Sequence, residues 1–300
     1  MGFTSILINA LILSSLYAVV AIGFTLVFGV GGVLNLSHGA LLTLGAFTSF
    51  LVVSRLGASL WVGLGAGAVV AGAIGVVLYA SLVQFLDEYP VMIVIVTLLC
   101  GGIIEHGLRI FVTQSTISID PLIAGDVTVL SQEIQLNQLF IFVSAWVLIA
   151  TLFVFVKYTT TGKALLAINA SSRGSKLVGI DTRRINAYTW FISSAFAGFA
   201  GVLLLSFLTG DWRMGTNPLI ISFAIVILGG LGSIRGSVVG AYVIGTMETM
   251  TTSIISANLT GFISLLMVIV VLLIKPRGLY GQHGMEELFQ QSKLLEGTDE

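Results

Sequence analysis

The sequence predicts an all-α fold: a polytopic transmembrane helical bundle of about eight to nine spans, some short or broken, with a cytoplasmic helix between two of them. Hydrophobic residues make up 56% of the 300 residues and charged residues only 9%, whereas roughly a quarter of a soluble domain is charged. The first charged side chain is Arg55, so the residues before it could not form the water-exposed surface of a soluble protein. The 35 glycines suit helices that approach closely in lipid.

Apolar runs bounded by charges, prolines or polar clusters divide the chain into nine expected helices. They are Ile6–Phe28, Ala40–Val53, Trp61–Phe85, Val91–Val112, Leu139–Val156, Ile185–Leu208, Leu219–Leu231, Val238–Ile255 and Leu259–Ile274. The first run is too long for the apolar core of a signal peptide, so we expect a retained span. A spanning helix needs about 20 residues. Ala40–Val53 and Leu219–Leu231 are shorter, and we expect half-length or broken helices there.

Basic residues predict the orientation of the spans. Six lysines and arginines lie between Lys157 and Arg184 against one acid, whereas the segment 113–136 has three acids and no base. Cytoplasmic loops carry an excess of Lys and Arg. We therefore expect the loop 158–184 in the cytoplasm and the segment 113–136 outside.

The end of the chain fits the same orientation. Lys275 and Arg277 follow the last span, which places the C-terminus inside, and nine crossings then place the N-terminus outside. We assign residues 1–281 to one transmembrane domain and residues 282–300 to a cytoplasmic polar tail. The external segment 113–136 is expected to be only partly ordered by itself and to offer an acidic surface to a binding protein.

Two glycine-rich breaks interrupt the apolar pattern, after the first and the seventh expected helix. The candidates for a helix break or a substrate path are Asn35, Ser37, His38 and Gly39 in the first break and Gly229, Gly230, Gly232 and Gly236 in the second. When Gly32 is laid on Gly229, His38 falls on Arg235, as in a duplicated membrane fold, although the many glycines explain this match equally well. The alternative to broken helices along a path is two tight cytoplasmic turns.

Four ionisable side chains fall at membrane depth, where such groups are costly and mark pathways or internal pairs. Glu105, His106 and Arg109 lie late in the fourth expected helix, and Glu248 lies mid-way along the eighth. Glu105 and Arg109 are four residues apart on one helix face, so we favour a structural ion pair over a substrate contact. Glu248 has no partner at helical spacing, and we expect one on another helix or across a subunit interface.

Several function classes are excluded. The net charge of −1 argues against nucleic-acid binding, and the single Cys100 rules out a disulfide framework or a Cys-based zinc site. No catalytic Ser or zinc-binding spacing accompanies His38, which we interpret as a packing or capping histidine. Gly162-Lys163 is not a P-loop, because Ala164 stands in place of Ser or Thr. We expect no metal, no cofactor and no catalysis in this chain.

Six motifs, taken together and in order, resemble one known family. They are Asn35-Leu36-Ser37-His38-Gly39, Thr161-Gly162-Lys163-Ala164, Leu177-Val178-Gly179-Ile180, Ala200-Gly201-Val202-Leu203, Gly229–Gly236 and Lys275–Leu279. The family is that of the permeases of high-affinity branched-chain amino acid ABC importers, and the resemblance runs nearly end to end.

The resemblance implies a permease subunit that forms, with a second related permease, the path for branched-chain or similar amino acids. Two cytoplasmic ATPases, which hydrolyse the ATP, and an extracytoplasmic substrate-binding protein would complete the complex in the plasma (inner) membrane of a prokaryote. The loop between the fifth and sixth spans would be the coupling segment that docks into an ATPase. Its implied coupling residues are Thr161, Gly162, Lys163, Ala164, Leu177 and Gly179.

One departure from the family pattern leaves the substrate open. Glu105-His106 stands where the family commonly has Gln-Asn, and relatives of this architecture carry urea, short amides or other amino acids. A hypothesis from another class is a stand-alone channel or permease for a small polar solute such as urea or a short amide, which would need no basic coupling loop. A membrane-embedded enzyme is a third hypothesis.

Overall fold

A computed structural model describes residues 3–87, 89–129, 132–256, 259, 261–275 and 278–280. The predicted tail, residues 282–300, lies outside the described residues. The helices are α1 (Phe3–Gly31), α2 (His38–Leu56), α3 (Leu60–Ser81), the short 3-10 helix η1 (Val83–Phe85), α4 (Pro90–Phe111), α5 (Leu136–Tyr158), α6 (Thr160–Ala170), α7 (Ser172–Leu177), α8 (Thr182–Phe207), α9 (Thr216–Gly229), α10 (Ile234–Ile254) and α11 (Phe262–Ile274). Strands β1 (Asp126–Val129) and β2 (Gln132–Gln135) pair antiparallel, with Val127 opposite Ile134.

Each of the nine predicted apolar runs overlaps a helix, which confirms the all-α membrane bundle. Within the described residues, six helices are long and apolar enough to cross a membrane, namely α1 to α5 and α8. A seventh span results if α9 and α10 are counted as one span, which is bent by 119° at the break between them. α11 is apolar but shorter.

One of the two expected short segments is longer than the sequence suggested. α2 runs from His38 to Leu56, 19 residues, so the expectation of a half-length helix at Ala40–Val53 is wrong. The helix includes the polar residues that we used as boundaries, because His38 is buried and Arg55 lies in the last turn, where a cation favours the helix dipole. The other expectation is confirmed: Leu219–Leu231 overlaps the 14-residue α9, which ends at the bend.

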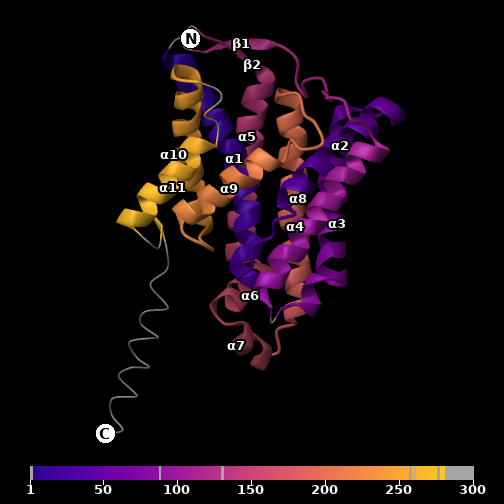
Figure 1. Cartoon of the computed structure of the whole chain (residues 1–300), viewed down its shortest axis with the longest axis vertical. Coiled ribbons are helices and arrows are strands. Elements are labelled where there is room, and N and C mark those ends of the chain that lie inside the picture. The colour runs from indigo at the N-terminus through magenta and orange to yellow at the C-terminus, as the bar shows by residue number, and fades with distance from the viewer. Residues whose placement is uncertain are drawn as a thin grey trace.

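Helix α1 forms the centre of the bundle (Figure 1). α10, α8, α5 and α9 pack around it, and every residue from Leu16 to Val27 is buried. A helix that is apolar all round is expected at such a central position. The core therefore surrounds α1, and α10, α8, α5 and α9 form a layer about it.

Three glycines allow α2, α3 and α8 to pack backbone against backbone. A Cβ atom on Gly67 would lie 2.5 Å from the carbonyl oxygen of Gly45, and one on Gly198 would lie 2.6 Å from the carbonyl oxygen of Gly67. Only hydrogen fits at these positions. Small residues at helix contacts are the usual means of close packing in lipid.

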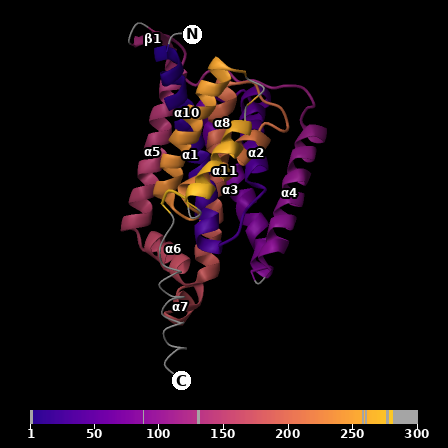
Figure 2. The same ribbon diagram turned by 60° about the vertical axis from the view of Figure 1, so that its left-hand side comes forward.

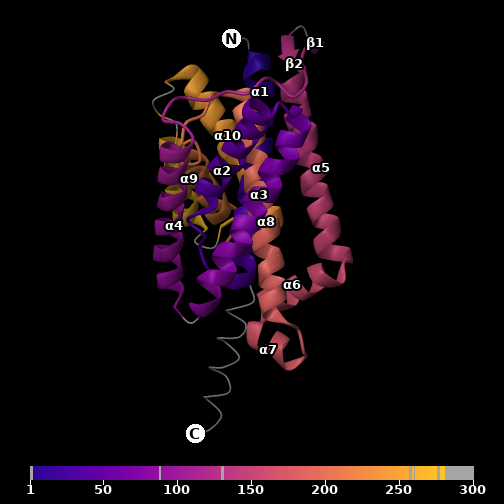
Figure 3. The same ribbon diagram turned by 90° about the vertical axis from the view of Figure 1, so that its right-hand side faces the viewer.

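The two ends of the bundle carry different structures. Figure 1 shows the beginning of α1 and the β1–β2 hairpin at one end and α6 and α7 at the other. α4 and α5 flank the bundle on opposite sides (Figure 2 and Figure 3). α4 packs chiefly against α2 and α5 chiefly against α1, so both present exposed apolar side chains such as Ile103 and Val147.

The described part of the segment 113–136 is held by partners elsewhere in the chain. The N–H of Ile117 donates to the carbonyl of Gly210 at 2.7 Å, and the N–H of Gly210 donates back at 2.9 Å. Leu122 is buried, and its N–H donates to Oδ1 of Asn137 at 3.1 Å. The order therefore comes partly from contacts with the α8–α9 connection and with the start of α5.

Candidate transport path and coupling site

Helix α2 begins inside the bundle rather than at its end. After α1 ends at Gly31 the chain turns back, and Nε2 of His38 lies 3.1 Å from the carbonyl oxygen of Val20, in the middle of α1. Because a carbonyl oxygen only accepts, Nε2 carries the hydrogen. Asn35 is 2% exposed, and Ser37 and His38 are fully buried. Three predicted break residues thus lie together at mid-depth.

The re-entrant segment, residues 32–37, obtains polar partners from nearby side chains. Oδ1 of Asn35 accepts from the N–H of Ser37 at 3.0 Å and from its hydroxyl at 2.6 Å. The N–H of Leu36 donates to the hydroxyl oxygen of Thr97 on α4 at 3.2 Å. Non-helical backbone at membrane depth needs partners of this kind.

His38 has the environment of a packing residue. Its ring meets Phe24 edge-on, with 5.7 Å between the ring centroids. Among the described residues its Nδ1 has no hydrogen-bond partner, whereas a general base is oriented through its second nitrogen. The arrangement fits the packing role that we predicted.

The first residues of α2 and the residue before α9 are in contact. A Cβ atom on Gly39 would lie 2.6 Å from the carbonyl oxygen of Gly215, and Gly215 faces the carbonyl of Gly39 in turn. The N–H of Gly215 donates to the hydroxyl oxygen of Thr43 at 3.0 Å. The amino ends of two helices, which carry partial positive charge, therefore meet in the interior.

The second glycine-rich break is a sharp elbow between α9 and α10. Gly230 and Gly232 have φ values of +102° and +80°, a conformation that favours glycine. Gly229 lies against Gly236, so the two helix ends touch through their backbones. The hydroxyl of Ser233 accepts from the N–H of Gly236 at 3.1 Å and caps α10. All four predicted residues of this break belong to the elbow.

Glu248 lies on α10 and is 2% exposed. Its Oε1 accepts from the N–H of Gly261 at 3.2 Å, and its Oε2 accepts from the hydroxyl of Ser264 at 2.6 Å. Gly261 precedes the first residue of α11, so a carboxylate lies at the positive end of that helix. The predicted partner on another helix is confirmed, and it belongs to the same chain.

The expected ion pair between Glu105 and Arg109 is not formed. The salt bridge found among the described residues joins Nε of Arg184 to Oδ2 of Asp181, at 2.9 Å. Arg109 instead lies over the ring of Trp212, 5.1 Å from its centroid. The aromatic ring offers the guanidinium a cation–π contact that the sequence spacing did not reveal.

Trp212, in the α8–α9 connection, gathers further side chains. The ring of His106 lies 5.1 Å from it, and the guanidinium of Arg213 lies 4.2 Å from its centroid on the same connection. Sequence analysis missed this tryptophan because its partners on α4 are distant in sequence. The contacts join α4, which otherwise packs chiefly against α2, to the α8–α9 connection.

A cavity of about 620 Å³ lies between α1, α8, α10 and the α8–α9 connection. It is lined by Leu13, Tyr17, Thr116, Leu204, Phe207, Leu208, Thr209, Gly210, Asp211, Met214, Asn217, Pro218, Glu248 and Thr252. Of the predicted site residues only Glu248 takes part. Tyr17 and Asp211 were missed, although the position of Asp211 in the connection between two apolar runs was a signal that could have found it.

The loop between α5 and α8 holds two helices, where we predicted a single cytoplasmic one. The hydroxyl oxygen of Thr159 accepts from the N–H of Gly162 at 2.9 Å and caps α6. The hydroxyl oxygen of Ser171 accepts from the N–H of Gly174 at 3.0 Å and caps α7. Ser171 has extended backbone, which divides the two helices.

The implied coupling residues differ in exposure along this loop. Gly162 is buried against the backbone of Phe155 and Val156 at the end of α5, where a Cβ atom does not fit. Thr161 and Ala164 are half-buried and Lys163 is exposed.

The end of α7 is strongly exposed. Leu177 is 83% and Val178 76% exposed, and Gly179 has φ of +81°, which closes the helix. Leu165 and Ile168 on α6 are buried and anchor that helix to the bundle. The loop therefore has a fixed base and an apolar tip.

The side chain of Asn169 on α6 reaches the elbow between α9 and α10. A Cβ atom on Gly29, near the end of α1, would lie 3.2 Å from Nδ2 of Asn169 and 3.6 Å from Cα of Gly232. Three segments that are far apart in sequence thus meet at one point. The loop therefore lies beside the broken helix.

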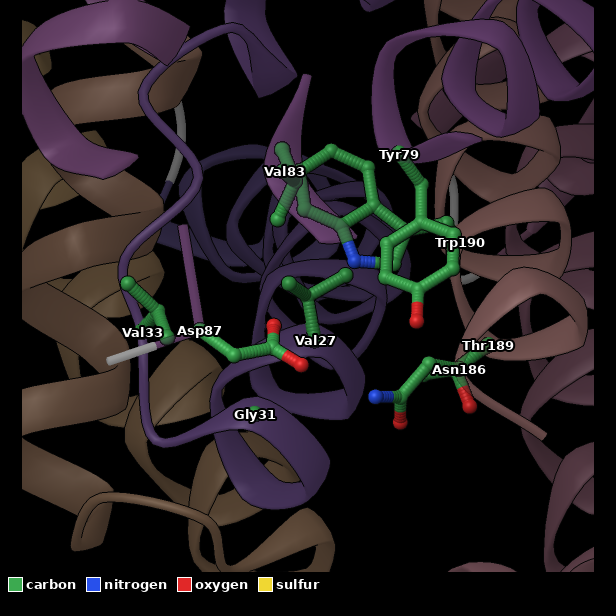
Figure 4. A pocket seen from close by; sticks show the side chains of 9 residues that line it. All are labelled: Val27, Gly31, Val33, Tyr79, Val83, Asp87, Asn186, Thr189 and Trp190. Atoms are coloured by element: carbon green, nitrogen blue, oxygen red, sulfur yellow. The ribbon is translucent and has the colours of Figure 1, made fainter. Parts of the chain in front are cut away.

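A second, much smaller cavity of about 20 Å³ lies between the ends of α1 and α3 and the start of α8, and it has room for about one water molecule. Figure 4 shows the carboxylate of Asp87, the amide of Asn186 and the hydroxyl of Tyr79 turned toward this space. Partial burial raises the pKa of Asp87, and Lys176 and Arg183 counteract the rise less strongly. Asp87 is thus coupled electrostatically to the loop that carries α7.

Comparison with protein families gives one match over most of the chain. The family described as "Branched-chain amino acid transport system / permease component" matches residues 6–272. No solved structure matches the chain significantly.

Three relatives carry related names. The high-affinity branched-chain amino acid transport system permease protein LivH of Escherichia coli (strain K12) is 28% identical, over 95% of this chain and 98% of the relative. The corresponding permease protein BraD of Pseudomonas aeruginosa is 26% identical, over 94% of this chain and 97% of the relative. A probable branched-chain amino acid transport permease protein LivH of Methanocaldococcus jannaschii is 28% identical, over 94% and 93%.

Proposed function

The chain belongs to the family of permease components of branched-chain amino acid transport systems, and from this premise we propose that it forms, with a second permease, the membrane path of an ATP-driven importer. Its substrates are branched-chain or similar amino acids. The energy comes from two separate ATPases, and an extracytoplasmic binding protein delivers the substrate. The chain itself needs no cofactor for this role.

The observation that carries the proposal is the form of the loop between α5 and α8. It ends in an exposed apolar tip, Leu177 and Val178, at one end of the bundle. Exposed apolar side chains rimmed by polar ones are typical of a docking surface. Arg173 and Lys176 supply the basic rim. We infer that α7 docks into a groove of an ATPase.

The contacts of α6 suggest how movement reaches the membrane. Gly162 and the buried Leu165 hold α6 against the bundle, so α6 and α7 move with the end of α5. The side-chain amide of Asn169 lies beside Gly29 on α1 and Gly232 at the elbow. Closure of the two ATPases would draw two such loops together and, through this contact, shift α9 relative to α10.

For the orientation, we propose that α6 and α7 lie in the cytoplasm and the β1–β2 hairpin lies outside, in the plasma membrane of a prokaryote. The basic residues of the loop 158–184 support it, because positive charge favours the cytoplasmic side. The hairpin lies at the opposite end of the bundle from α7 (Figure 1). The N-terminus is then external.

The test is reconstitution of the complete transporter in proteoliposomes with measurement of leucine uptake and ATP hydrolysis. Leu177→Glu should abolish the stimulation of ATP hydrolysis by substrate while the chain still reaches the membrane. Leu56→Glu is the matched control, since Leu56 is 77% exposed at the end of α2, and it should keep the stimulation. Leucine or urea flux through this chain alone, without ATP, would favour the stand-alone channel instead.

A further inference from the structure

A cavity with both polar and apolar lining residues lies between α1, α8, α10 and the α8–α9 connection. Its volume of about 620 Å³ falls in the range of small-molecule sites, about 300–1,000 Å³. Resting on the proposed function, we propose that this cavity is the permease's own binding site for a zwitterionic amino acid with an aliphatic side chain, and that Asp211 and Glu248 receive its ammonium group.

The apolar part of the lining suits an aliphatic side chain. Six apolar residues contribute to it: Leu13, Leu204, Phe207, Leu208, Met214 and Pro218. Leu13 lies on α1, Leu204 and Phe207 on α8, Leu208 and Met214 in the α8–α9 connection, and Pro218 at the start of α9, so several elements contribute to the apolar lining. Binding sites for small molecules typically combine such a lining with a few polar groups that fix the orientation.

The charged part of the lining favours an ammonium group. Asp211 and Glu248 are the charged residues of the cavity lining, and the lining contains no base. Oδ1 of Asp211 accepts from the N–H of Arg213 at 2.8 Å, which leaves Oδ2 for a ligand. The two oxygens of Glu248 each accept one hydrogen bond from α11, and a carboxylate oxygen has a second lone pair.

Tyr17 supplies an independent observation. Its side chain is 8% exposed and lines the cavity, and among the described residues its hydroxyl forms no hydrogen bond. A tyrosine hydroxyl can donate one hydrogen bond, and this one is available to a ligand in the cavity. A bound carboxylate would accept its hydrogen.

The start of α9 offers further donors for a carboxylate. Asn217 lies in the first turn of α9, where backbone N–H groups have no intrahelical acceptor. Helix starts that face a carboxylate are a recurring feature of transporter sites at broken helices. The cavity thus provides acceptors for one end of a zwitterion and donors for the other, whereas an anion without an ammonium group would meet only repulsion from Asp211 and Glu248.

Protection from labelling tests the proposal directly. In the transporter reconstituted without its binding protein, Thr209→Cys in a Cys100→Ser background should react with an impermeant thiol reagent, and leucine should slow the reaction. Thr128→Cys on β1 is the control, because Thr128 is exposed and outside the cavity; it should be labelled at a rate that leucine does not change. 3-Methylbutan-1-amine should protect Thr209→Cys and 4-methylpentanoate should not.

Point variants add a second measurement. Asp211→Asn should raise the leucine concentration for half-protection at least about tenfold, the effect of losing a charge-assisted hydrogen bond, and Tyr17→Phe should raise it by a smaller factor. Asp126→Asn, in the hairpin, should leave it unchanged.

The outcomes separate this inference from the proposed function. If the complete wild-type transporter couples ATP hydrolysis to leucine uptake but leucine does not protect Thr209→Cys, or 4-methylpentanoate protects as well as leucine, the cavity assignment is wrong and the proposed function stands. If the complete transporter shows no ATP-dependent amino acid uptake, the proposed function itself is wrong.

Discussion

The Oε2 atom of Glu248 on α10 lies 2.6 Å from the hydroxyl oxygen of Ser264 on α11. The carboxylate also accepts from the N–H of Gly261 at the start of α11. A single buried acid therefore joins the second half of the bent pair to the last helix. Glu248 thus has both a structural partner and a position in the cavity lining.

Replacement of Glu248 should destabilise the contact between α10 and α11. In Glu248→Leu the buried hydroxyl of Ser264 loses its acceptor, at a cost of about 1–3 kcal/mol, and the part-buried N–H of Gly261 loses its acceptor as well. Glu248→Gln keeps one acceptor oxygen and should lose less. Denaturation of the purified chain in detergent measures the loss. Glu133→Leu, at an exposed position in β2, is the control, and equal stability of both leucine variants would contradict the role of Glu248.

The contact between Gly39 and Gly215 should tolerate no added side chain. Gly215→Ala places a methyl group against the carbonyl of Gly39, and overpacking of this kind typically costs about 1–3 kcal/mol. Gly102→Ala is the matched control, because a Cβ atom there meets nothing within 4 Å. Thermal denaturation in detergent should separate the two variants, and a wild-type melting temperature for Gly215→Ala would contradict the contact.

Coupling should depend on the close approach of α6 to α5. Gly162→Val forces a side chain into the backbone at Phe155 and Val156 and should displace α6, so substrate-stimulated ATP hydrolysis in proteoliposomes should fall although the permease still inserts. Lys163→Glu reverses an exposed charge and should also lower substrate-stimulated ATP hydrolysis. Gly107→Val, at an open position on α4, should not. Full stimulation of ATP hydrolysis by substrate in Gly162→Val would contradict the coupling role of α6.

Stability should depend on pH through Asp87. Burial raises the pKa of this carboxyl group, so folding favours its neutral form. The stability that the neutral carboxyl group contributes is fully present below the ordinary pKa of an aspartate. It is lost as the pH rises through the raised pKa of the folded chain. Asp87→Asn should therefore match the wild type near about pH 4 and exceed its melting temperature at neutral pH, by less than about 4 °C because partly exposed charges contribute little.

A second variant checks the cause of this pH dependence. Lys176 lowers the pKa of Asp87, so Lys176→Gln should move the loss of stability to higher pH. A pH dependence that is the same in the wild type and in Asp87→Asn would show that another group is responsible.

The orientation can be tested with two single cysteines in a Cys100→Ser background. Thr128→Cys on β1 should react with an impermeant thiol reagent added outside intact cells. Leu177→Cys at the tip of α7 should react only in inverted membrane vesicles. The reverse pattern would invert the proposed topology while leaving the helix packing unchanged.

Hydrophobicity was enough to predict where the helices lie, because each apolar run is separated from the next by polar or charged residues. Hydrophobicity did not predict where each helix begins and ends. α2 was expected to be half-length because His38 and Arg55 looked like boundaries, yet burial of His38 among α1 side chains allows the helix to start there. Partners from other helices decide such a boundary, and a local pattern does not contain them.

Some of the site residues could likewise be predicted from the sequence, and others could not. The glycine clusters predicted the elbow at Gly230 and Gly232 because positive φ angles leave a strong sequence signal. The cavity could not be predicted, since Tyr17 and Asp211 come together only when α1 meets the α8–α9 connection. The expected Glu105–Arg109 pair failed for the same reason: Trp212, distant in sequence, lies beneath Arg109.

The hydrogen bond from Leu36 to Thr97 has a consequence for biosynthesis. The ribosome completes α1 and the re-entrant segment well before it reaches Thr97, so at first the N–H of Leu36 lacks this acceptor. A polar segment cannot settle at mid-depth in lipid with unmet backbone groups. α2 therefore reaches its final position only after α4 has entered the membrane, and insertion of the first four helices is a cooperative process rather than a series of independent steps.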